Sequence, residues 1–274
     1  MAELPDVATF KRYFDATALH QEITGSQILD EQMLDGLTAT ELDRGLVGHV
    51  FAATRRHGKY LFALLDDADD GALVLHFGMT GSLRYFKRSD AMPEHARVLI
   101  RFSNGYLLAV VSQRLLGGLS LTDDPDAFIT ERGLGPDALN DLSDEASFRR
   151  ALEGHGGMLK PTLTNQAIVA GIGNLYVDEM LYQAGLDPRM PADELDDRAF
   201  AELFRAIRRV LETAVERDAE PTEFPSDWIT RHREPGATCP RCGGEIERLE
   251  VSGRGTYWCP ACQGGAGGGG GGGA

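Results

Sequence analysis

Four cysteines near the end of the chain constrain its fold more than any other feature. They form two pairs, Cys239-Pro240-Arg241-Cys242 and Cys259-Pro260-Ala261-Cys262, and the sequence contains no other cysteine. Two Cys-x-x-Cys pairs at this spacing are typical of a site in which four thiolates hold one zinc ion. Two disulfides are the alternative, but an acidic chain without a signal segment is typical of a compartment where thiols stay reduced. We therefore expect one structural zinc ion.

The segment between the two cysteine pairs is predicted to form a β-hairpin, with short strands at 246–251 and 257–258. Arg254 lies within Ser252-Gly253-Arg254-Gly255-Thr256. The glycines let the backbone approach a ligand and would put a guanidinium at the hairpin tip, which suits contact with phosphate or with a minor groove. A solvated hairpin arginine explains the same pattern, when the hairpin is taken alone.

The length and charge of the chain limit the classes of function. With 274 residues, it can hold two modest domains and the cysteine ribbon. A net charge of −15 argues against broad coating of nucleic acid. Basic residues nevertheless collect in a few segments, which are 55–59, 84–88, 205–209 and 231–233. No apolar run is long enough to span a bilayer and no signal pattern begins the chain, so we expect a cytoplasmic, nucleoid-associated protein.

The hydrophobic pattern changes near residue 125. Residues 6–20 are predicted to be helical, and short β-branched and aromatic runs follow between 46 and 121. The expected strands are 47–53, 60–65, 73–77, 97–102 and 106–111, and Asn104-Gly105 predicts a hairpin between the last two. This pattern favours a β-sandwich. Beyond it, helices are expected from Ser143 as N-cap to 152, at 174–184 before Gly185, and along 200–214.

Four further segments precede the ribbon. In chain order they are Met1-Ala2-Glu3-Leu4-Pro5-Asp6-Val7, His57-Gly58-Lys59-Tyr60, His76-Phe77-Gly78-Met79-Thr80-Gly81-Ser82-Leu83, and the segment from Val169 to Glu179 that contains Gly171-Ile172-Gly173-Asn174. Together with the four cysteines, they closely resemble the formamidopyrimidine-DNA glycosylase and endonuclease VIII family of DNA-repair enzymes. The resemblance covers all of the chain except its glycine-rich end.

The resemblance implies an α+β multidomain fold and a division of the chain into four parts. These are an N-terminal catalytic β-sandwich domain flanked by helices, a helical DNA-binding domain with a helix–two-turn–helix, a zinc-finger hairpin and a flexible glycine tail, at 1–125, 126–234, 235–263 and 264–274. Damaged double-stranded DNA would be the partner of a monomeric protein, with the damaged nucleotide flipped out of the duplex. The implied activity is that of a DNA glycosylase with abasic-site lyase activity in base excision repair.

The resemblance assigns the chemistry to the start of the chain. After removal of Met1, the α-amine of residue 2 would attack the sugar C1′, expel the base and form a Schiff base, with Glu3 transferring protons. Relatives usually have proline at this position, where this chain has Ala2. The substitution leaves a primary amine, for which we expect slower elimination. A catalytically weak module that binds damaged DNA is the alternative function.

The remaining site residues also follow from the resemblance. Lys59 and Arg254 would contact the phosphates at the lesion as part of the catalytic site, and His76, Lys160 and Asn174 would contact the DNA backbone. Met79 would fill the void left by the flipped base. Arg114 would face the orphaned base, and Leu116 would replace an aromatic wedge. Taken without the resemblance, Leu115 and Leu116 would be core residues and His76 would be structural.

The segment from 215 to 239 is short and lacks the long, glycine-rich lesion loop of relatives that specialise in oxidised purines. We therefore expect oxidised pyrimidines, ring-opened purines or abasic sites to be preferred over 8-oxoguanine. A zinc-ribbon transcription or RNA-binding factor is a third possible function, but it gives no purpose to Met79 or to the segment 1–7.

Overall fold

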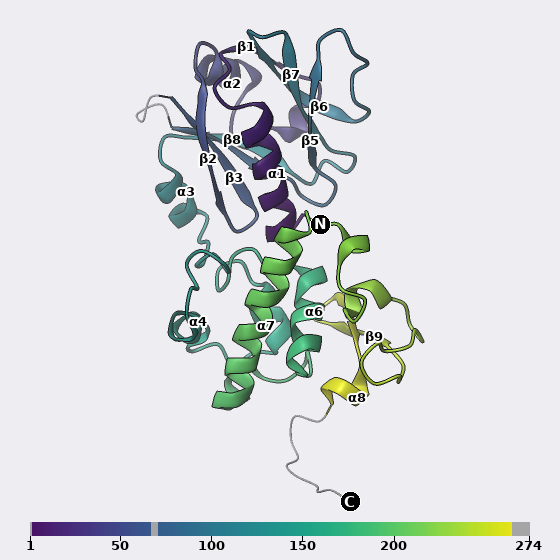
Figure 1. Ribbon diagram of the computed structural model, residues 1–274. Helices are drawn as coiled ribbons and strands as arrows, with labels where there is room; N and C mark the ends of the chain where they lie inside the picture. The colour runs from purple at the N-terminus through teal and green to yellow at the C-terminus, as the bar shows by residue number, and fades with distance from the viewer. Residues whose placement is uncertain (1, 67–70, 265–274) are drawn as a thin grey trace, which may run out of the picture. The chain divides into compact units, whose positions relative to one another are not determined.

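The computed structural model describes residues 2–66 and 71–264, and the chain divides after Gly133 into two compact units. The first unit runs to Gly133 and contains all strands of the sandwich. The second unit begins at Leu134 and contains most of the helices and the cysteine ribbon (Figure 1). Of the predicted glycine tail at 264–274, only Gly264 lies within the described residues.

The first unit is a β-sandwich of two four-stranded antiparallel sheets. One sheet has the strand order β1-β6-β7-β5 and is made of Ile23–Ile28, Ala96–Phe102, Tyr106–Val111 and Ser82–Lys87. The other has the order β2-β3-β4-β8 and is made of Phe51–His57, Tyr60–Leu65, Ala72–His76 and Gly118–Thr122. The predicted sandwich is confirmed, although β1, β5 and β8 were not predicted as strands.

Helix α1 (Leu4–Thr17) packs its apolar face into the main core of this unit. Phe14 meets the ring of Phe51 edge to face at a centroid distance of 5.1 Å. The helix begins two residues before the predicted start because the Glu3 and Asp6 side chains and backbones form a reciprocal capping box. The residue that we expect to transfer protons is therefore also the N-cap of the first helix.

Smaller helical elements complete the first unit. They are the 3-10 turn η1 (Glu31–Met33), α2 (Ala39–Leu46) and α3 (Pro125–Glu131). Helix α3 covers the outer face of the second sheet, where Phe128 lies 5.6 Å from the ring of Phe62. The predicted hairpin between β6 and β7 is confirmed, and of Asn104 and Gly105 only the glycine has a positive φ.

The second unit is mainly helical. Its elements are α4 (Glu145–Leu152), α5 (Leu159–Thr164), α6 (Asn174–Ala184), η3 (Ala192–Glu194), α7 (Asp197–Glu216), η4 (Pro221–Glu223), η5 (Ile229–His232) and α8 (Pro260–Gln263). Helix α6 begins and ends as predicted, with Gly185 at φ 69° as its C-cap. The predicted N-cap Ser143 is wrong: Asp144 caps α4, because it exchanges cap bonds with Ser147. Among the helices of residues 2–66 and 71–264, none has the length and apolar character needed to cross a bilayer.

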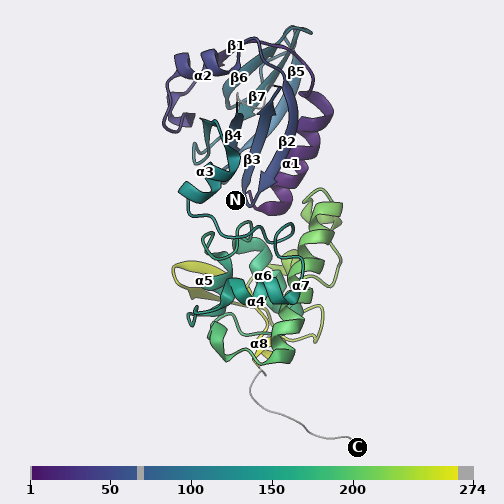
Figure 2. The ribbon, with the colours of Figure 1, turned by 90° about the vertical axis from the view of Figure 1, so that its left-hand side faces the viewer.

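The ribbon hairpin consists of β9 (Glu247–Val251) and β10 (Arg254–Trp258). Its two turn residues, Ser252 and Gly253, have φ values of 48° and 75°, as a tight two-residue hairpin turn requires. Arg254 pairs with Val251 and so begins β10. Arg254 therefore lies beside the hairpin tip and not at the tip, where the sequence had suggested it. The hairpin lies next to α5 (Figure 2).

Candidate functional site

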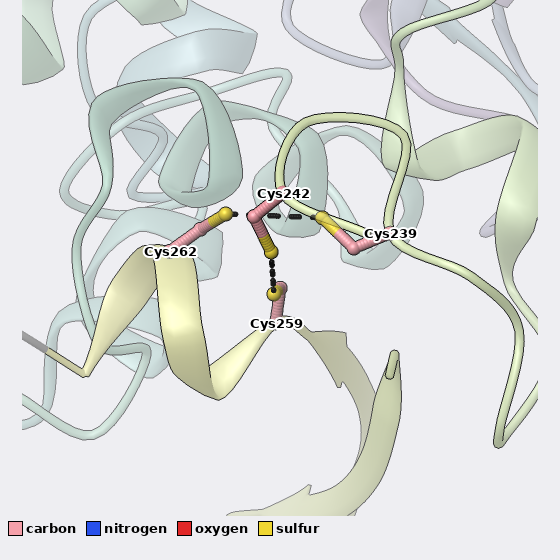
Figure 3. Close-up of side chains that lie close together, drawn as sticks. All are labelled: Cys239, Cys242, Cys259 and Cys262. Atoms are coloured by element: carbon pink, nitrogen blue, oxygen red, sulfur yellow. Dashed lines mark hydrogen bonds between the residues drawn. The ribbon is translucent and has the colours of Figure 1, made fainter. Parts of the chain in front are cut away.

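The four cysteines lie together as a metal site requires (Figure 3). All four Sγ atoms lie within 4.8 Å of one another, with Cys239 and Cys262 at 3.8 Å and Cys242 and Cys259 at 3.5 Å. Tetrahedral zinc with Zn–S bonds of about 2.3 Å separates its sulfurs by about 3.8 Å, whereas a disulfide needs about 2.05 Å. The cysteines therefore fit one structural zinc ion, and the disulfide alternative is wrong.

The metal site is tied to the C-terminal end of α6. The Tyr182 hydroxyl lies 3.3 Å from the Cys239 sulfur, and the Arg241 guanidinium lies 4.3 Å from the Tyr182 ring. On the other side, the Gln263 amide accepts from the Cys259 N–H at 2.8 Å and donates to the Leu186 carbonyl at 2.9 Å. These contacts fix the position of the ribbon on the helical unit.

The hairpin of the ribbon is also attached to α5, through the side chain of Lys160. The ammonium donates to Asp178 at 2.6 Å, to Thr256 at 2.8 Å and to the Gly255 carbonyl at 3.2 Å. The side chain is 1% exposed, and these three bonds use all three of its N–H donors. Contact of Lys160 with phosphate stays a prediction, while in this structure its donors are all used within the protein.

Asp178 is the acceptor at the centre of this cluster. Its carboxylate also accepts from the Tyr257 N–H at 3.1 Å and pairs with Arg233 at 3.0 Å. Burial raises the pKa of Asp178, and the cations Arg233 and Lys160 oppose that rise. Burial likewise lowers the pKa of Lys160, opposed by Asp178. The cluster therefore depends on charge pairing within a buried site.

Asn174 and Arg254 lie around the same hairpin carbonyl and a nearby cavity. The Asn174 side-chain amide donates to the Gly255 carbonyl at 3.1 Å, while the Arg254 guanidinium donates to the Thr164 hydroxyl at 2.8 Å. A cavity of about 420 Å³ adjoins them, lined by Lys160, Pro161, Thr164, Asn165, Gln166, Val251, Ser252 and Arg254. Arg254 is exposed, and the N-terminus of α6 begins at Asn174. These groups offer several N–H donors to an anion.

In the first unit, the start of the chain lies against the loop that carries Met79. The Ala2 nitrogen donates to the Gly78 carbonyl at 2.8 Å, and Ala2 and Glu3 are both buried. Lys59 occupies the two-residue turn between β2 and β3, where Gly58 has φ 54°. Burial raises the pKa of Asp6, the capping partner of Glu3, and this rise is opposed by the Glu3 backbone N–H and by the charge of Lys59.

His76 ends strand β4 and is partly buried. Its ring lies 4.9 Å from the ring of Tyr60, and it lines a cavity of about 320 Å³ together with Arg132 and Asp35. Burial lowers the pKa of His76, and the positive charges of Lys59 and Arg132 lower it further. A neutral imidazole at neutral pH retains one ring N–H with which to donate a hydrogen bond.

Two adjacent loops present the three predicted base-contacting residues. Met79 and Leu116 are 42% and 51% exposed, and Arg114 is exposed as well. The loops touch closely, because a Cβ on Gly78 would lie 2.3 Å from the carbonyl carbon of Leu116. Leu115, at φ 52°, turns its side chain onto the core. Leu116 is therefore not a core residue, unlike its neighbour.

Sequence reasoning missed Thr164, which accepts the hydrogen bond from Arg254. Thr164 belongs to no motif of the resemblance. The available signal was its spacing of four residues from Lys160, which puts both side chains on one face of a helix. The Gly255 carbonyl was missed because backbone acceptors leave no trace in a sequence.

Three family models match successive parts of the chain. The formamidopyrimidine-DNA glycosylase N-terminal domain matches residues 1–119, and the H2TH domain of the same enzyme matches 134–226. The third match, at 236–264, is to a zinc finger found in FPG and IleRS.

Curated relatives and solved structures agree with these matches. The chain is 31% identical to the formamidopyrimidine-DNA glycosylase of Pelotomaculum thermopropionicum and 33% identical to that of Laribacter hongkongensis, covering 96% of this chain and 99% and 100% of those proteins. Two similar structures are Lactococcus lactis Fpg bound to abasic-site DNA and to DNA containing FAPY-dG. Their TM-scores are 0.84 and 0.85, each at 28% identity, covering 95% of this chain and 99% of those chains. The chain therefore belongs to the formamidopyrimidine-DNA glycosylase family.

Proposed function

We propose that this protein is a base-excision-repair DNA glycosylase with abasic-site lyase activity, which removes oxidised bases from duplex DNA. The family match extends along almost the whole chain, and the similar Lactococcus lactis structures hold damaged or abasic DNA. The catalytic assignment is supported most directly by the 2.8 Å hydrogen bond from the Ala2 nitrogen to the carbonyl of Gly78. Because Gly78 directly precedes Met79, this bond holds the proposed nucleophile next to the loop that carries the proposed wedge. Zinc serves a structural role in the ribbon.

The proposed reaction starts when the Ala2 amine, freed by removal of Met1, attacks C1′ of a flipped nucleotide. A bond forms between nitrogen and C1′, the glycosidic bond breaks, and the base leaves with the electron pair and gains a proton. Opening of the sugar ring gives a Schiff base, and loss of the C2′ proton then expels the 3′ phosphate. An α-amine has a reference pKa of about 7.7–8.0, so a useful fraction is neutral near pH 7. Glu3 is proposed to move the protons.

The DNA contacts are proposed for residues in both units. Lys59, His76 and Arg254 supply cationic or N–H contacts to phosphates, as does Asn174 with the N-terminus of α6. Lys160, which the resemblance predicts to contact the DNA backbone, directs its three donors at Asp178, Gly255 and Thr256. Met79 and Leu116 unstack the duplex at the lesion, and Arg114 faces the orphaned base. Exposure of Met79, Leu116 and Arg114 on touching loops supports this assignment.

Borohydride reduction in the presence of abasic DNA tests the proposed nucleophile. Correctly trimmed protein should become covalently attached to DNA, and peptide mapping should find the adduct on Ala2. Absence of an adduct, with Met1 removal verified by mass, would reject Ala2 as the nucleophile. Glu3→Gln should retain DNA affinity and lose base excision. This variant distinguishes the enzyme from a catalytically weak binding module, because Glu3→Gln would alter neither the DNA affinity of such a module nor its low excision rate.

The preferred lesions are a further proposal. Between α7 and the ribbon, the chain holds only two short 3-10 turns, at Pro221–Glu223 and Ile229–His232. With so short a segment, we propose that oxidised pyrimidines, ring-opened purines and abasic sites are better substrates than 8-oxoguanine. Single-turnover excision rates on a panel of lesions would test this, and preferential removal of 8-oxoguanine opposite cytosine would contradict it. Because chromosomal DNA is the proposed substrate, we place the protein in the cytoplasm at the nucleoid.

A further inference from the structure

Lys160 and Thr164 lie one turn apart on α5, and both side chains reach the start of β10. Lys160 donates to the carbonyl of Gly255 and to the hydroxyl of Thr256, and Thr164 accepts from the guanidinium of Arg254. One face of a short helix therefore holds three successive residues of the hairpin. Both α5 residues are buried, whereas Arg254 is exposed.

We propose that Lys160 and Thr164 are positioning residues that fix Arg254 for its phosphate contact and do not themselves touch DNA. This inference rests on the proposed function, because it assigns a purpose to the contacts of the proposed Arg254 site. It also replaces direct phosphate contact by Lys160 with an indirect role.

Lys160 has no donor left for a phosphate. Its three N–H groups are directed at Asp178, Gly255 and Thr256. Turning the ammonium toward solvent would leave the buried Asp178 carboxylate with only one of its two cations, and removing a partner from a buried ion pair is costly. The charge of Lys160 is therefore paired with Asp178 on α6, and its other two donors are used by the hairpin.

Thr164 has an acceptor suited to a guanidinium. Its hydroxyl donates back to the Lys160 carbonyl at 3.0 Å, so an oxygen lone pair remains to accept from Arg254 at 2.8 Å. The guanidinium has five N–H donors, and fixing one of them orients the planar group without using the rest. Restricting a long side chain before binding lowers the entropy lost when it meets its ligand. Thr164 thus holds Arg254 beside the 420 Å³ cavity in an orientation that can bind phosphate.

The first test uses Thr164→Val, which keeps the shape of the side chain and removes its hydroxyl. We expect a roughly tenfold loss of affinity for a duplex with a stable abasic-site analogue, the size of one hydrogen bond to a charged group. Thr164→Ser keeps the hydroxyl and should restore affinity. Thr162→Val is the matched control, because the Thr162 hydroxyl also bonds back to its helix, at 2.9 Å to Met158, but does not contact Arg254. Equal losses from Thr162→Val and Thr164→Val would overturn the proposal.

A double-mutant cycle with Arg254→Ala distinguishes positioning from direct contact. If Thr164 and Lys160 act through Arg254, Thr164→Val and Lys160→Met should weaken binding in the wild-type background and have no effect in the Arg254→Ala background. A direct phosphate contact by Lys160 would instead persist in that background and lower the salt slope by about 0.9. That result would overturn the role of Lys160. If Lys160→Met does not fold, the Thr164 cycle decides alone.

The same experiment separates failure of this inference from failure of the proposed function. An Arg254→Ala variant that binds abasic DNA as well as wild type would remove Arg254 from the DNA site, and the inference with it. A strong effect of Arg254→Ala, with none from Thr164→Val, would reject only the positioning role. Melting temperature and zinc content of every variant serve as controls for folding.

Discussion

Glu179 is a buried carboxyl on α6 whose charge state changes near neutral pH. One oxygen accepts from the Thr230 N–H and hydroxyl, each at 2.8 Å, and the other accepts from Gln183 at 2.7 Å. Burial raises the pKa of Glu179 to about 7, although the hydrogen bonds from Gln183 and Thr230 oppose the rise. The negative charge of Asp227 is a smaller contribution to this rise, and the value of about 7 includes all of these effects. This carboxyl ties α6 to the segment that leads into the ribbon.

The elevated pKa of Glu179 predicts a stability that depends on pH. The folded state holds this proton up to about pH 7, whereas the unfolded chain releases it near 4.5. The contribution is therefore complete below pH 4.5 and is lost as pH rises toward 7, by at most about 1.4 kcal/mol per pH unit. Glu179→Gln should flatten the fall in unfolding free energy between pH 5.5 and 7, as measured by urea denaturation. An unchanged pH profile would show that Glu179 is ionised in the folded protein.

We expect Ala2→Pro to cleave the DNA strand faster than the wild-type protein at high pH. The imine formed by a primary amine can lose its proton, and each pH unit above its pKa lowers the reactive protonated fraction about tenfold. An iminium from proline stays charged. The ratio of elimination rates, Ala2→Pro over wild type, should therefore grow from pH 7 to pH 9 in single-turnover assays on abasic DNA. A ratio that does not change with pH would contradict this account of the substitution.

At the residue scale, the sequence predicts groups that belong to local motifs and misses those defined by tertiary contacts. The four zinc ligands follow from their spacing alone, since a knuckle is a local structure. The exposure of Leu116 agrees with the wedge position that the resemblance implies, whereas its neighbour Leu115 is partly buried against the core. The bonds that Thr164 and Lys160 make with the hairpin could not be predicted, because those partners lie 90 to 96 residues away in the sequence.

At the element scale, the ribbon depends on its metal for the contacts that the hairpin makes with α5. Structural zinc sites contribute directly to folding free energy, so removal of a ligand loosens the element. Cys242→Ser should lower zinc content and should reduce affinity for abasic DNA at least as much as Arg254→Ala, because Gly255 and Thr256 also lose their anchors. Zinc stoichiometry and equilibrium binding would be measured on the same samples. A zinc-deficient variant with full affinity would contradict the prediction.

The loop that carries Leu115 and Leu116 allows a matched pair of substitutions. Leu116 is 51% exposed, so Leu116→Ala should change unfolding free energy by less than about 0.5 kcal/mol and still slow base excision. Leu115 packs against the core, so Leu115→Ala should be the more destabilising change. Thermal unfolding and excision rates measured for both variants test the assignment. Normal excision by Leu116→Ala would remove this residue from the proposed wedge.

Element boundaries were predictable where capping is local. Gly185 ends α6 at the predicted residue because a left-handed C-cap needs no tertiary partner. Asp144 displaced Ser143 as the N-cap of α4, since both residues are good caps and only the register with Ser147 separates them. Strand β1 was missed because Gly25 and Ser26 weaken its pattern, and pairing with β6 supplies what local propensity lacks.

At the scale of the whole molecule, an acidic protein that binds DNA must do so through few cations. The net charge is −15, and two cationic side chains, Lys59 and Arg254, are proposed to contact phosphate. Two phosphate contacts by cations predict a slope of about −2 for log affinity against log salt. Fluorescence anisotropy at several salt concentrations would measure it. A slope near −8 would mean that the basic segments take a much larger part in binding.

The general architecture was predictable because each part has its own pattern. Short β-branched and aromatic runs indicated the sandwich, the helical period indicated the second unit, and the cysteine pairs indicated the ribbon. The division after Gly133 places α3 with the sandwich, where Phe128 contacts Phe62. The sequence alone could not assign α3, because its short length carries little periodicity and its partner face is set by the fold.

The carbonyl of Gly255 accepts from two side chains, Lys160 and Asn174. A bare peptide oxygen carries partial negative charge and would repel any phosphate that approached the neighbouring guanidinium. With an ammonium and an amide directed at it, that dipole is shielded, and the local field next to Arg254 becomes attractive to anions. An overall acidic protein can in this way keep a small electropositive spot without adding a single surface cation.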